Sequence, residues 1–191
     1  WLDEGRVSSV LVGAVDEFSK AQACAWQDRA DSNPADARLP AIGEGACFLL
    51  LTTGTAAQNA YACIDAVGLG RQLNAGRQPD VPEADRYIIG ADGYGGRDGD
   101  YPTVLPGGRP AAAYSHVYGV LPVGMAFDLA IAALSVDGEK RFTGAQLPAL
   151  EGLGRDPGRP KSGERFCCLK LGAEKGFGWA TLRAPGRRQA P

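Results

Sequence analysis

The stretch "GADGYGGRDGDY", residues 90–101, packs five glycines and three aspartates into twelve positions. It follows the apolar run "RYII", residues 86–89, and precedes "PTVLP", residues 102–106. A flexible, acidic turn at the end of a predicted strand has three interpretations. It could bind calcium, it could cradle a phosphate, or it could be a catalytic turn that has lost its catalytic side chain.

The spacing within this turn argues against the first two interpretations. An EF-hand loop counted from Asp92 would place Tyr94 at ligand position 3 and Arg97 at the position that requires glycine. A dinucleotide or phosphate loop needs GxGxxG or GxxxxGK[ST] before a helix. Both "GLGRQL", residues 68–73, and "GYGGRD", residues 93–98, lack the third glycine. The sequence therefore favours the third interpretation, a former catalytic turn.

The overall composition is that of an ordinary globular chain large enough to bury a core. The 191 residues are 45% apolar and 22% charged, with a formal net charge of −2. This balance predicts no binding to nucleic acid or anionic membranes. The longest apolar helical stretch, residues 123–136, is interrupted by Asp128 and is too short to span a bilayer. Without a recognisable signal peptide, we expect a soluble cytoplasmic protein with no membrane span.

The cysteines predict buried thiols in a reducing compartment rather than a disulfide framework. Their number is odd and none are spaced as CxxC. We expect core positions for all five, which are Cys24, Cys47, Cys63, Cys167 and Cys168.

Apolar runs alternating with polar, glycine- and proline-rich segments predict an α/β domain. The first strand, with Val10, Leu11 and Val12 in succession, is typical of a strand covered on both faces. Spacing of apolar residues at helical intervals predicts one strong helix over 121–136. The predicted strands are 7–17, 45–53, 60–70 and 86–91, with two more within 165–183; residues 1–6 are expected to end a helix and 27–44 to form a loop.

The glycine turn resembles a motif of the β-ketoacyl synthase family, within the thiolase-like superfamily. Laid on "HGTGTxxGD" of those condensing enzymes, "DGYGGRDGD", residues 92–100, keeps Gly93, Gly95, Gly99 and Asp100. The leading catalytic histidine of the motif is replaced by Asp92.

Further motifs of the same family follow in order along nearly the whole chain. "AAYSHVYGVLPVGMAFDLAIAALSV" resembles "KSxxGHxxGAAGxxxxIxxxLAL" and places His116 on the second catalytic histidine. The closing segment 167–182 takes the place of "NSFGFGGxNAxLVL", with its glycines displaced. The other matches are 7–17 with "ALVGGVDE", 41–51 with "GEGAGVLVLE" and 60–70 with "YAEIVGYG".

This resemblance implies a layered, thiolase-like α/β fold. Residues 1–54 would end its N-terminal half and residues 55–191 would form its C-terminal half. It also implies acyl chains delivered on acyl carrier protein or coenzyme A, with no further cofactor or metal. The implied site residues are His116 and Asp92 at catalytic positions, with Gly93, Tyr94, Gly95 and Gly119 lining the substrate site.

Two departures from the family pattern affect the predicted activity. The nucleophilic cysteine of the family belongs upstream of Trp1, so no cysteine of this chain is in register with it. Asp92 is an anion at physiological pH unless strongly desolvated, and would oppose rather than stabilise a developing enolate. Decarboxylation of the family's kind is therefore not expected at this site.

We therefore predict a non-catalytic subunit similar to chain-length factors of fatty-acid or polyketide biosynthesis. Its partners would be an active ketosynthase or a second copy, and acyl carrier protein. The alternative is an active β-ketoacyl synthase or acyltransferase whose nucleophile lies in an N-terminal half outside this sequence. A former enzyme fold reused for binding is the third interpretation.

Overall fold

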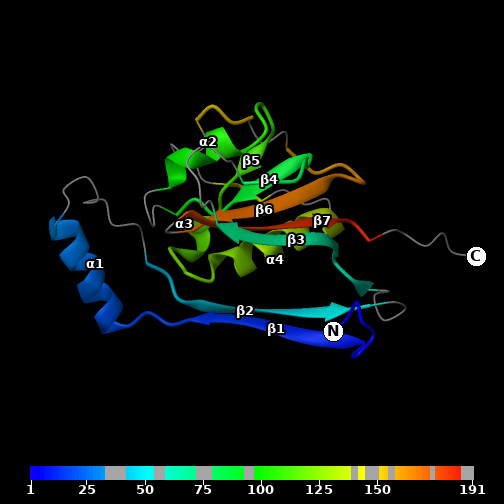
Figure 1. The fold of residues 1–191 in the computed structure, drawn as a ribbon, viewed down its shortest axis with the longest axis horizontal. Helices are drawn as coiled ribbons and strands as arrows, with labels where there is room; N and C mark the ends of the chain where they lie inside the picture. Colours follow the sequence, from blue (N-terminus) through cyan, green and yellow to red (C-terminus); the bar gives the residue numbers. More distant parts are fainter. Residues whose placement is uncertain are drawn as a thin grey trace, which may run out of the picture.

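The computed structural model forms two sheets with helices between and around them, which confirms the predicted mixed α/β class (Figure 1). The structure describes residues 1–32, 42–53, 59–71, 79–92, 97–138, 142–144, 151–154, 158–172 and 175–185. The strands are β1 (Ser9–Asp16), β2 (Gly45–Thr52), β3 (Cys63–Arg71), β4 (Arg86–Ile89), β5 (Ala111–Ala112), β6 (Arg165–Leu171) and β7 (Gly176–Arg183). The helices are α1 (Lys20–Ser32), α2 (Tyr101–Val104), α3 (Ser115–Tyr118) and α4 (Gly124–Gly138), with a 3-10 turn, η3 (Asp98–Asp100).

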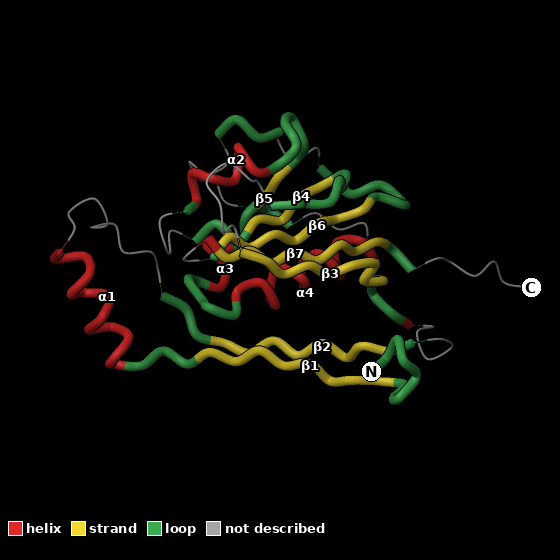
Figure 2. Tube along the Cα trace, viewed as in Figure 1, coloured by secondary structure: helices red, strands yellow, loops and turns green. Residues whose placement is uncertain are grey.

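The larger sheet has five strands in the order β3-β7-β6-β4-β5 (Figure 2). Strand β4 runs parallel to both of its neighbours, β5 and β6. Strand β7 runs antiparallel to β6 and to β3. All four residues of β4 are buried, because the strand is central and covered on both faces. The carboxyl ends of β5, β4 and β6 therefore meet at one edge of the sheet.

Alternate residues of the central strands enter two separate apolar cores. On one face, Tyr87, Ile89 and Leu169 pack with Tyr101 of α2. On the other face, residues one position along each strand pack against α4; this second core contains Ile88, Phe166, Cys168, Leu182, Ala132 and Val136. The period of two along β4 and β6 thus assigns each side chain to one layer.

Helix α4 lies between the five-stranded sheet and a second sheet, the antiparallel pair β1–β2 (Figure 1). The Sγ atom of Cys47 on β2 donates to the carbonyl oxygen of Ala126 on α4 at 3.3 Å. Gly45 faces the ring of Phe127 so closely that a Cβ there would lie 3.0 Å from it. The arrangement is a layered stack of sheet, helix and sheet, as the resemblance predicted.

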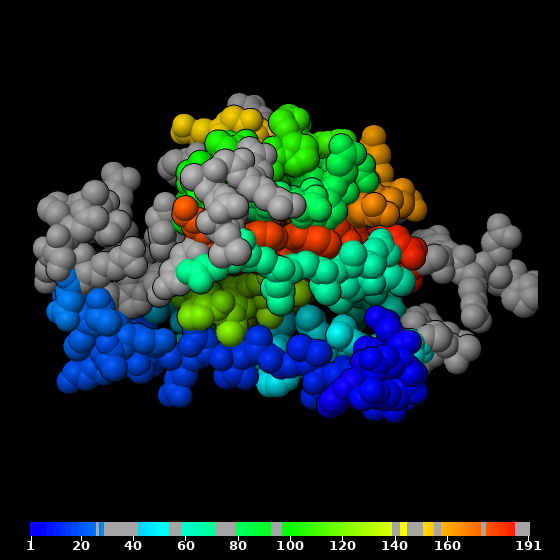
Figure 3. Space-filling view, viewed as in Figure 1, coloured from blue at the N-terminus to red at the C-terminus, as the bar shows by residue number. Residues whose placement is uncertain are grey.

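The outer face of the β1–β2 pair is apolar and exposed. Figure 3 shows this pair, in blue and cyan, as a separate layer beneath α4. Leu11 is 66% exposed and Leu50, its register partner, is 67% exposed. The prediction that the first strand is covered on both faces is not met in the described residues, because α4 covers one face only. We call this antiparallel strand pair the hairpin, although α1 lies between its two strands in the sequence. The side chains of its exposed face, called here the hairpin outer face, are Leu11, Val15, Phe48 and Leu50.

The strands predicted over 45–53, 60–70, 86–91 and 165–183 are confirmed, and the long helix begins at Gly124, just after Pro122. The loop predicted over 27–44 is wrong in its first part, because α1 extends to Ser32. A capping box explains where α1 begins: Ser19 Oγ accepts from the Gln22 amide at 3.2 Å and Gln22 Oε1 accepts from the Ser19 amide at 2.9 Å.

Two smaller predictions are also wrong. Residues 2–5 form turns rather than the end of a helix. Cys24 is exposed on α1, because the polar helix that carries it buries little of its surface; Cys167 and Cys168 are buried as predicted, and Cys47 and Cys63 are partly buried.

Candidate functional site

Polar side chains gather at the carboxyl ends of the three parallel strands. Asp92 follows β4, the segment after β5 leads into Ser115 and Tyr118 of α3, and Lys170 lies next to the last residue of β6. In open α/β sheets, ligands bind outside the carboxyl ends of parallel strands. This edge is therefore the candidate site on topology alone.

The Asp92 carboxylate is buried and forms an ion pair with the ammonium group of Lys170. The side chain of Asp92 is 4% exposed and that of Lys170 is 19% exposed. The Lys170 stem lies directly against Gly90, where a Cβ would overlap it. Glycine at position 90 is therefore needed for Lys170 to reach across β4 to Asp92.

A second polar pair lies beside the first. The Tyr118 hydroxyl donates to Oδ1 of Asp128 on α4 at 2.8 Å. Asp128 is 1% exposed, and this burial raises the pKa of its carboxyl to about 7. The charge of Asp92 adds to the rise, whereas the Tyr118 hydrogen bond and the Lys170 charge oppose it. Burial first, and then the charge of Asp128, also raises the pKa of Tyr118. The four side chains therefore form one electrostatically coupled cluster.

The backbone around the cluster is fixed by short hydrogen bonds. Ser115 Oγ donates to the carbonyl oxygen of Ala91 at 2.7 Å, which ties α3 to the end of β4. Helix α3 ends at Tyr118 and is followed by Gly119, whose φ of 79° lies in the left-handed region and whose amide donates to the Ser115 carbonyl at 2.7 Å. Glycine at position 119 thus allows the chain to turn directly after Tyr118.

The far side of the glycine turn is also attached to β6 and β7. Arg97 Nε pairs with Asp100 Oδ2 at 2.8 Å. Its Nη1 donates to the carbonyl oxygens of Gly172 at 3.4 Å and Gly176 at 3.3 Å. The Asp100 carboxylate therefore helps to hold the Arg97 side chain in place. Arg97, through Gly172 and Gly176, and Asp92, through Lys170, both attach the turn to β6 and β7.

The residues predicted for the site lie in three different situations. Asp92 is a buried member of the polar cluster, and Gly119 directly follows Tyr118 of the same cluster. His116 is exposed, and its ring lies 6.5 Å from that of Tyr114, with an interplanar angle of 27°. Its catalytic role stays a prediction. The predictions for Gly93, Tyr94 and Gly95 fall outside the described residues.

Sequence reasoning missed Lys170, Tyr118 and Asp128. Two of them carried a signal: a lysine within the apolar strand "FCCLKL", and an aspartate within the apolar helix run 123–136. A charged residue in a buried segment requires a partner, and the two pairs supply it. Tyr118 carried no comparable signal.

The cluster offers hydrogen-bond donors and carboxylates rather than a metal site. The Lys170 ammonium pairs with Asp92, the Tyr118 hydroxyl donates to Asp128, and Asp128 can hold a proton near neutral pH. In the part of the chain that the structure describes, no three His, Cys, Asp or Glu side chains are placed to hold a metal ion.

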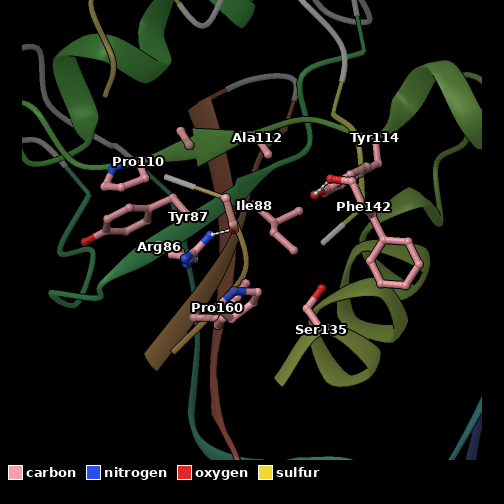
Figure 4. A pocket seen from close by; sticks show the side chains of 12 residues that line it. Arg86, Tyr87, Ile88, Pro110, Ala112, Tyr114, Ser135, Phe142 and Pro160 are labelled. Atoms are coloured by element: carbon pink, nitrogen blue, oxygen red, sulfur yellow. Dashed lines mark hydrogen bonds between the residues drawn. The ribbon is translucent and has the colours of Figure 1, made fainter. Parts of the chain in front are cut away.

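Two concave regions lie away from the cluster, and structural contacts account for both. A cavity of about 20 Å³ lies beside Arg86, Tyr114 and Ser135 and has room for about one water molecule (Figure 4). Arg86 is satisfied there: Nε pairs with Glu164 at 2.6 Å, and Nη1 and Nη2 donate to the carbonyls of Gly158 and Arg159 at 2.6 and 2.9 Å. Its role is to attach the segment before β6 to the sheet.

An open basin of about 300 Å³ lies at the opposite end of the sheet, near the amino ends of β4 and β6. Two of its three arginines, Arg165 and Arg183, pair with Asp65, at 3.7 and 2.7 Å. Structural ion pairs thus account for much of the charge at this basin. Among the described residues, no helix has the length and apolar character needed to cross a membrane.

Comparison with known proteins identifies the fold. No protein-family model and no curated protein matches the sequence. A β-ketoacyl synthase from Burkholderia phymatum STM815 matches the structure with a TM-score of 0.66 at 14% identity, over 96% of this chain and 56% of that one. The ishigamide ketosynthase/chain length factor matches with a TM-score of 0.68 at 15% identity, over 96% and 55%.

A ketosynthase from module 6 of the bacillaene synthase of Bacillus subtilis 168 matches with a TM-score of 0.73 at 11% identity, over 98% of this chain and 43% of that one. The chain thus has the thiolase-like α/β fold of the ketosynthases, as its motifs predicted. It spans about half the length of the solved structures it matches.

Proposed function

We propose that this chain belongs to a ketosynthase-like protein of fatty-acid or polyketide biosynthesis and acts as a non-catalytic subunit, similar to a chain-length factor. It would pair with an active β-ketoacyl synthase and receive acyl chains carried by acyl carrier protein. The observation that carries the proposal is the buried Asp92–Lys170 ion pair.

The negative charge at position 92 supports this proposal. Decarboxylative condensation develops negative charge on a thioester oxygen, which a neutral or cationic donor stabilises. The resemblance assigns that donor to the position of Asp92. A carboxylate there, held close to the Lys170 ammonium, uses the local positive charge within the pair instead of directing it at substrate. This arrangement favours an acyl-binding subunit over a decarboxylating one.

The proteins of similar structure support the proposal that this chain belongs to a ketosynthase-like protein. One of them is described as a ketosynthase/chain length factor, and another is a type II polyketide ketosynthase in complex with its acyl-carrier protein and bound to the hexaketide. These descriptions apply to those proteins, and the proposal extends them to this chain.

The test measures assembly and turnover separately. The full chain, co-purified from its native source, is examined by native mass spectrometry, and the complex is assayed for condensation and for decarboxylation of a malonyl carrier. We expect a ketosynthase partner in the complex, and condensation that is unaffected within about twofold by Asp92→Asn or by His116→Ala, the two positions that the resemblance assigns to catalysis.

Loss of turnover by tenfold or more in either variant, with the complex intact, would assign the chemistry to this chain and favour the alternative of an active synthase. The absence of any ketosynthase-like partner would overturn the proposed pairing.

A further inference from the structure

We propose that Tyr118, backed by Asp128, is the hydrogen-bond donor of this site for a carbonyl oxygen of the bound acyl chain, and that a proton on Asp128 turns the donor toward the ligand. The inference rests on the proposed function, because it takes an acyl chain as the ligand. It assigns the ligand contact to Tyr118, two residues beyond the exposed His116.

The position of Tyr118 supports this role. It lies at the end of α3, at the carboxyl edge of the parallel strands, and its ring is partly buried against Phe127, with a centroid distance of 5.2 Å. The ring is therefore held in place while the hydroxyl remains within the polar cluster. His116, in the same helix, is exposed.

The state of Asp128 determines what the Tyr118 hydroxyl can do. When Asp128 is ionised, the phenol donates its only proton to Oδ1, the contact seen at 2.8 Å. When Asp128 is protonated, its own O–H can donate to the phenol oxygen. The phenolic proton is then available to a ligand carbonyl.

The groups that surround Asp128 come from four elements. They are Tyr118 of α3, Asp92 after β4, Lys170 and Cys168 of β6, and Tyr101 of α2. Burial raises the pKa values of Tyr118, Tyr101 and Cys168 away from neutrality. Burial raises the pKa of Asp128 to about 7, so this carboxyl can gain or lose its proton in the physiological pH range.

The cluster also indicates which acyl chains fit. A saturated acyl chain carries only its thioester carbonyl, so its alkyl part offers no acceptor to the two polar pairs that it would cover, which is unfavourable. A chain that carries a keto oxygen can accept from Tyr118. We therefore expect preference for a β-ketoacyl chain over a saturated chain of the same length.

The test uses two probes that differ only in the keto oxygen, the amide analogues of acetoacetyl-pantetheine and butyryl-pantetheine. Binding to the full chain in its complex is measured by calorimetry between pH 5.5 and 8.5. We expect about five- to tenfold tighter binding of the acetoacetyl probe below pH 6.5, the effect of one neutral hydrogen bond. The preference should decline as the pH rises through 7.

Three variants separate this role from a structural one. Tyr118→Phe should lose the preference while it binds the butyryl probe as before. Asp128→Asn, whose amide can donate to the phenol oxygen at every pH, should keep the preference and lose its pH dependence. Val117→Ala, at an exposed position of the same helix that has no assigned role in the site, should match the parent chain in both respects.

Equal binding of the two probes by the parent chain, a preference that survives Tyr118→Phe, or a pH dependence that survives Asp128→Asn would each overturn the assignment. Assembly of each variant with its partner, followed by native mass spectrometry, shows separately whether the proposed function holds. A fluorescence melting curve for each variant confirms that the fold is intact.

Discussion

The five-stranded sheet and the β1–β2 hairpin are built from similarly apolar strands, but the chain buries them differently. Ile89 and Leu169 of the sheet are 0% and 1% exposed, whereas Leu11 and Leu50 of the hairpin are 66% and 67% exposed. Helices α2 and α4 pack on opposite faces of the central strands of the sheet, although Val67 and Leu69 on the edge strand β3 are 69% and 90% exposed. Helix α4 covers only the inner face of the hairpin. The apolar sequence of a strand therefore does not determine how deeply it is buried, because burial depends on which elements pack against each face.

The difference also indicates where stability resides. Buried apolar area removed from water contributes about 25 cal/mol per Å², and an exposed side chain contributes little of it. An isolated two-stranded sheet is marginally stable in water. We therefore expect the five-stranded sheet and α4 to form the stable unit, and the hairpin to depend on its contact with α4.

Replacing one leucine in each region should change the free energy of unfolding by very different amounts. Leu169→Ala should lower the free energy of unfolding by about 2–5 kcal/mol, because it leaves a cavity in a closely packed core. Leu50→Ala should change it by less than about 0.5 kcal/mol in the purified chain. Urea denaturation followed by circular dichroism measures both. A loss above 2 kcal/mol for Leu50→Ala would show that the hairpin outer face is covered in solution.

The free energy of unfolding should also depend on pH, because Asp128 of α4 is buried against the five-stranded sheet. The pKa of Asp128 is raised to about 7 in the folded chain from an ordinary value of 3.8, so the folded state binds this proton more tightly. The resulting stabilisation is complete below pH 4, and is lost as the pH rises through 7, by up to about 4 kcal/mol. Asp128→Asn should remove this loss.

The measurement is chemical denaturation at pH 5 and pH 8 for the parent chain and the Asn variant. Asp137, also on α4 but exposed, provides the control substitution Asp137→Asn, which should leave the slope unchanged. The idea fails if the parent and Asp128→Asn lose the same free energy between the two pH values.

The sequence predicted the central sheet and the glycine turn because those features are local. The continuous apolar run of β4 and the spacing of glycines after it can be read without tertiary contacts. The pairs Asp92–Lys170 and Tyr118–Asp128 join residues 78 and 10 positions apart. Such pairing depends on strand order and helix placement, which composition does not specify. Helix α1 was missed because it has no apolar stripe, although its capping box could have revealed its start.

A smaller effect should arise where the hairpin meets the candidate site. Gly43, just before β2, lies so close to the carbonyl oxygen of Tyr118 that a Cβ would overlap it, and its amide donates to the Val120 carbonyl at 3.2 Å. Gly43→Ala should therefore destabilise the chain by about 1–3 kcal/mol, because backbone must move. Gly107→Ala, where no atom lies within 4 Å, is the matched control.

This substitution acts on both regions, because Gly43 lies before β2 and contacts the backbone of Tyr118 at the candidate site. Hydrogen exchange of Gly43→Ala should show faster exchange in β2 and around Tyr118, with the amides of β6 and β7 unchanged. Uniform acceleration throughout the five-stranded sheet would mean that hairpin and sheet unfold as one unit, which contradicts the expected division.

The smallest expected effect comes from surface charge at the sheet edge. Asp65 on β3 pairs with Arg183 on β7 at 2.7 Å, and both remain partly exposed. Glu4 and Arg6 form a similar 2.8 Å pair in the turn before β1, with both side chains largely exposed. Because exposed pairs contribute little, Asp65→Asn should cost about 0.2–1 kcal/mol and Glu4→Gln less than that. Both losses should become smaller in 1 M salt, because salt screens the interaction of exposed charges. A salt-independent loss for Asp65→Asn would instead mean that its hydrogen bonds to the arginines, rather than its charge, hold the edge strand β3 to β7.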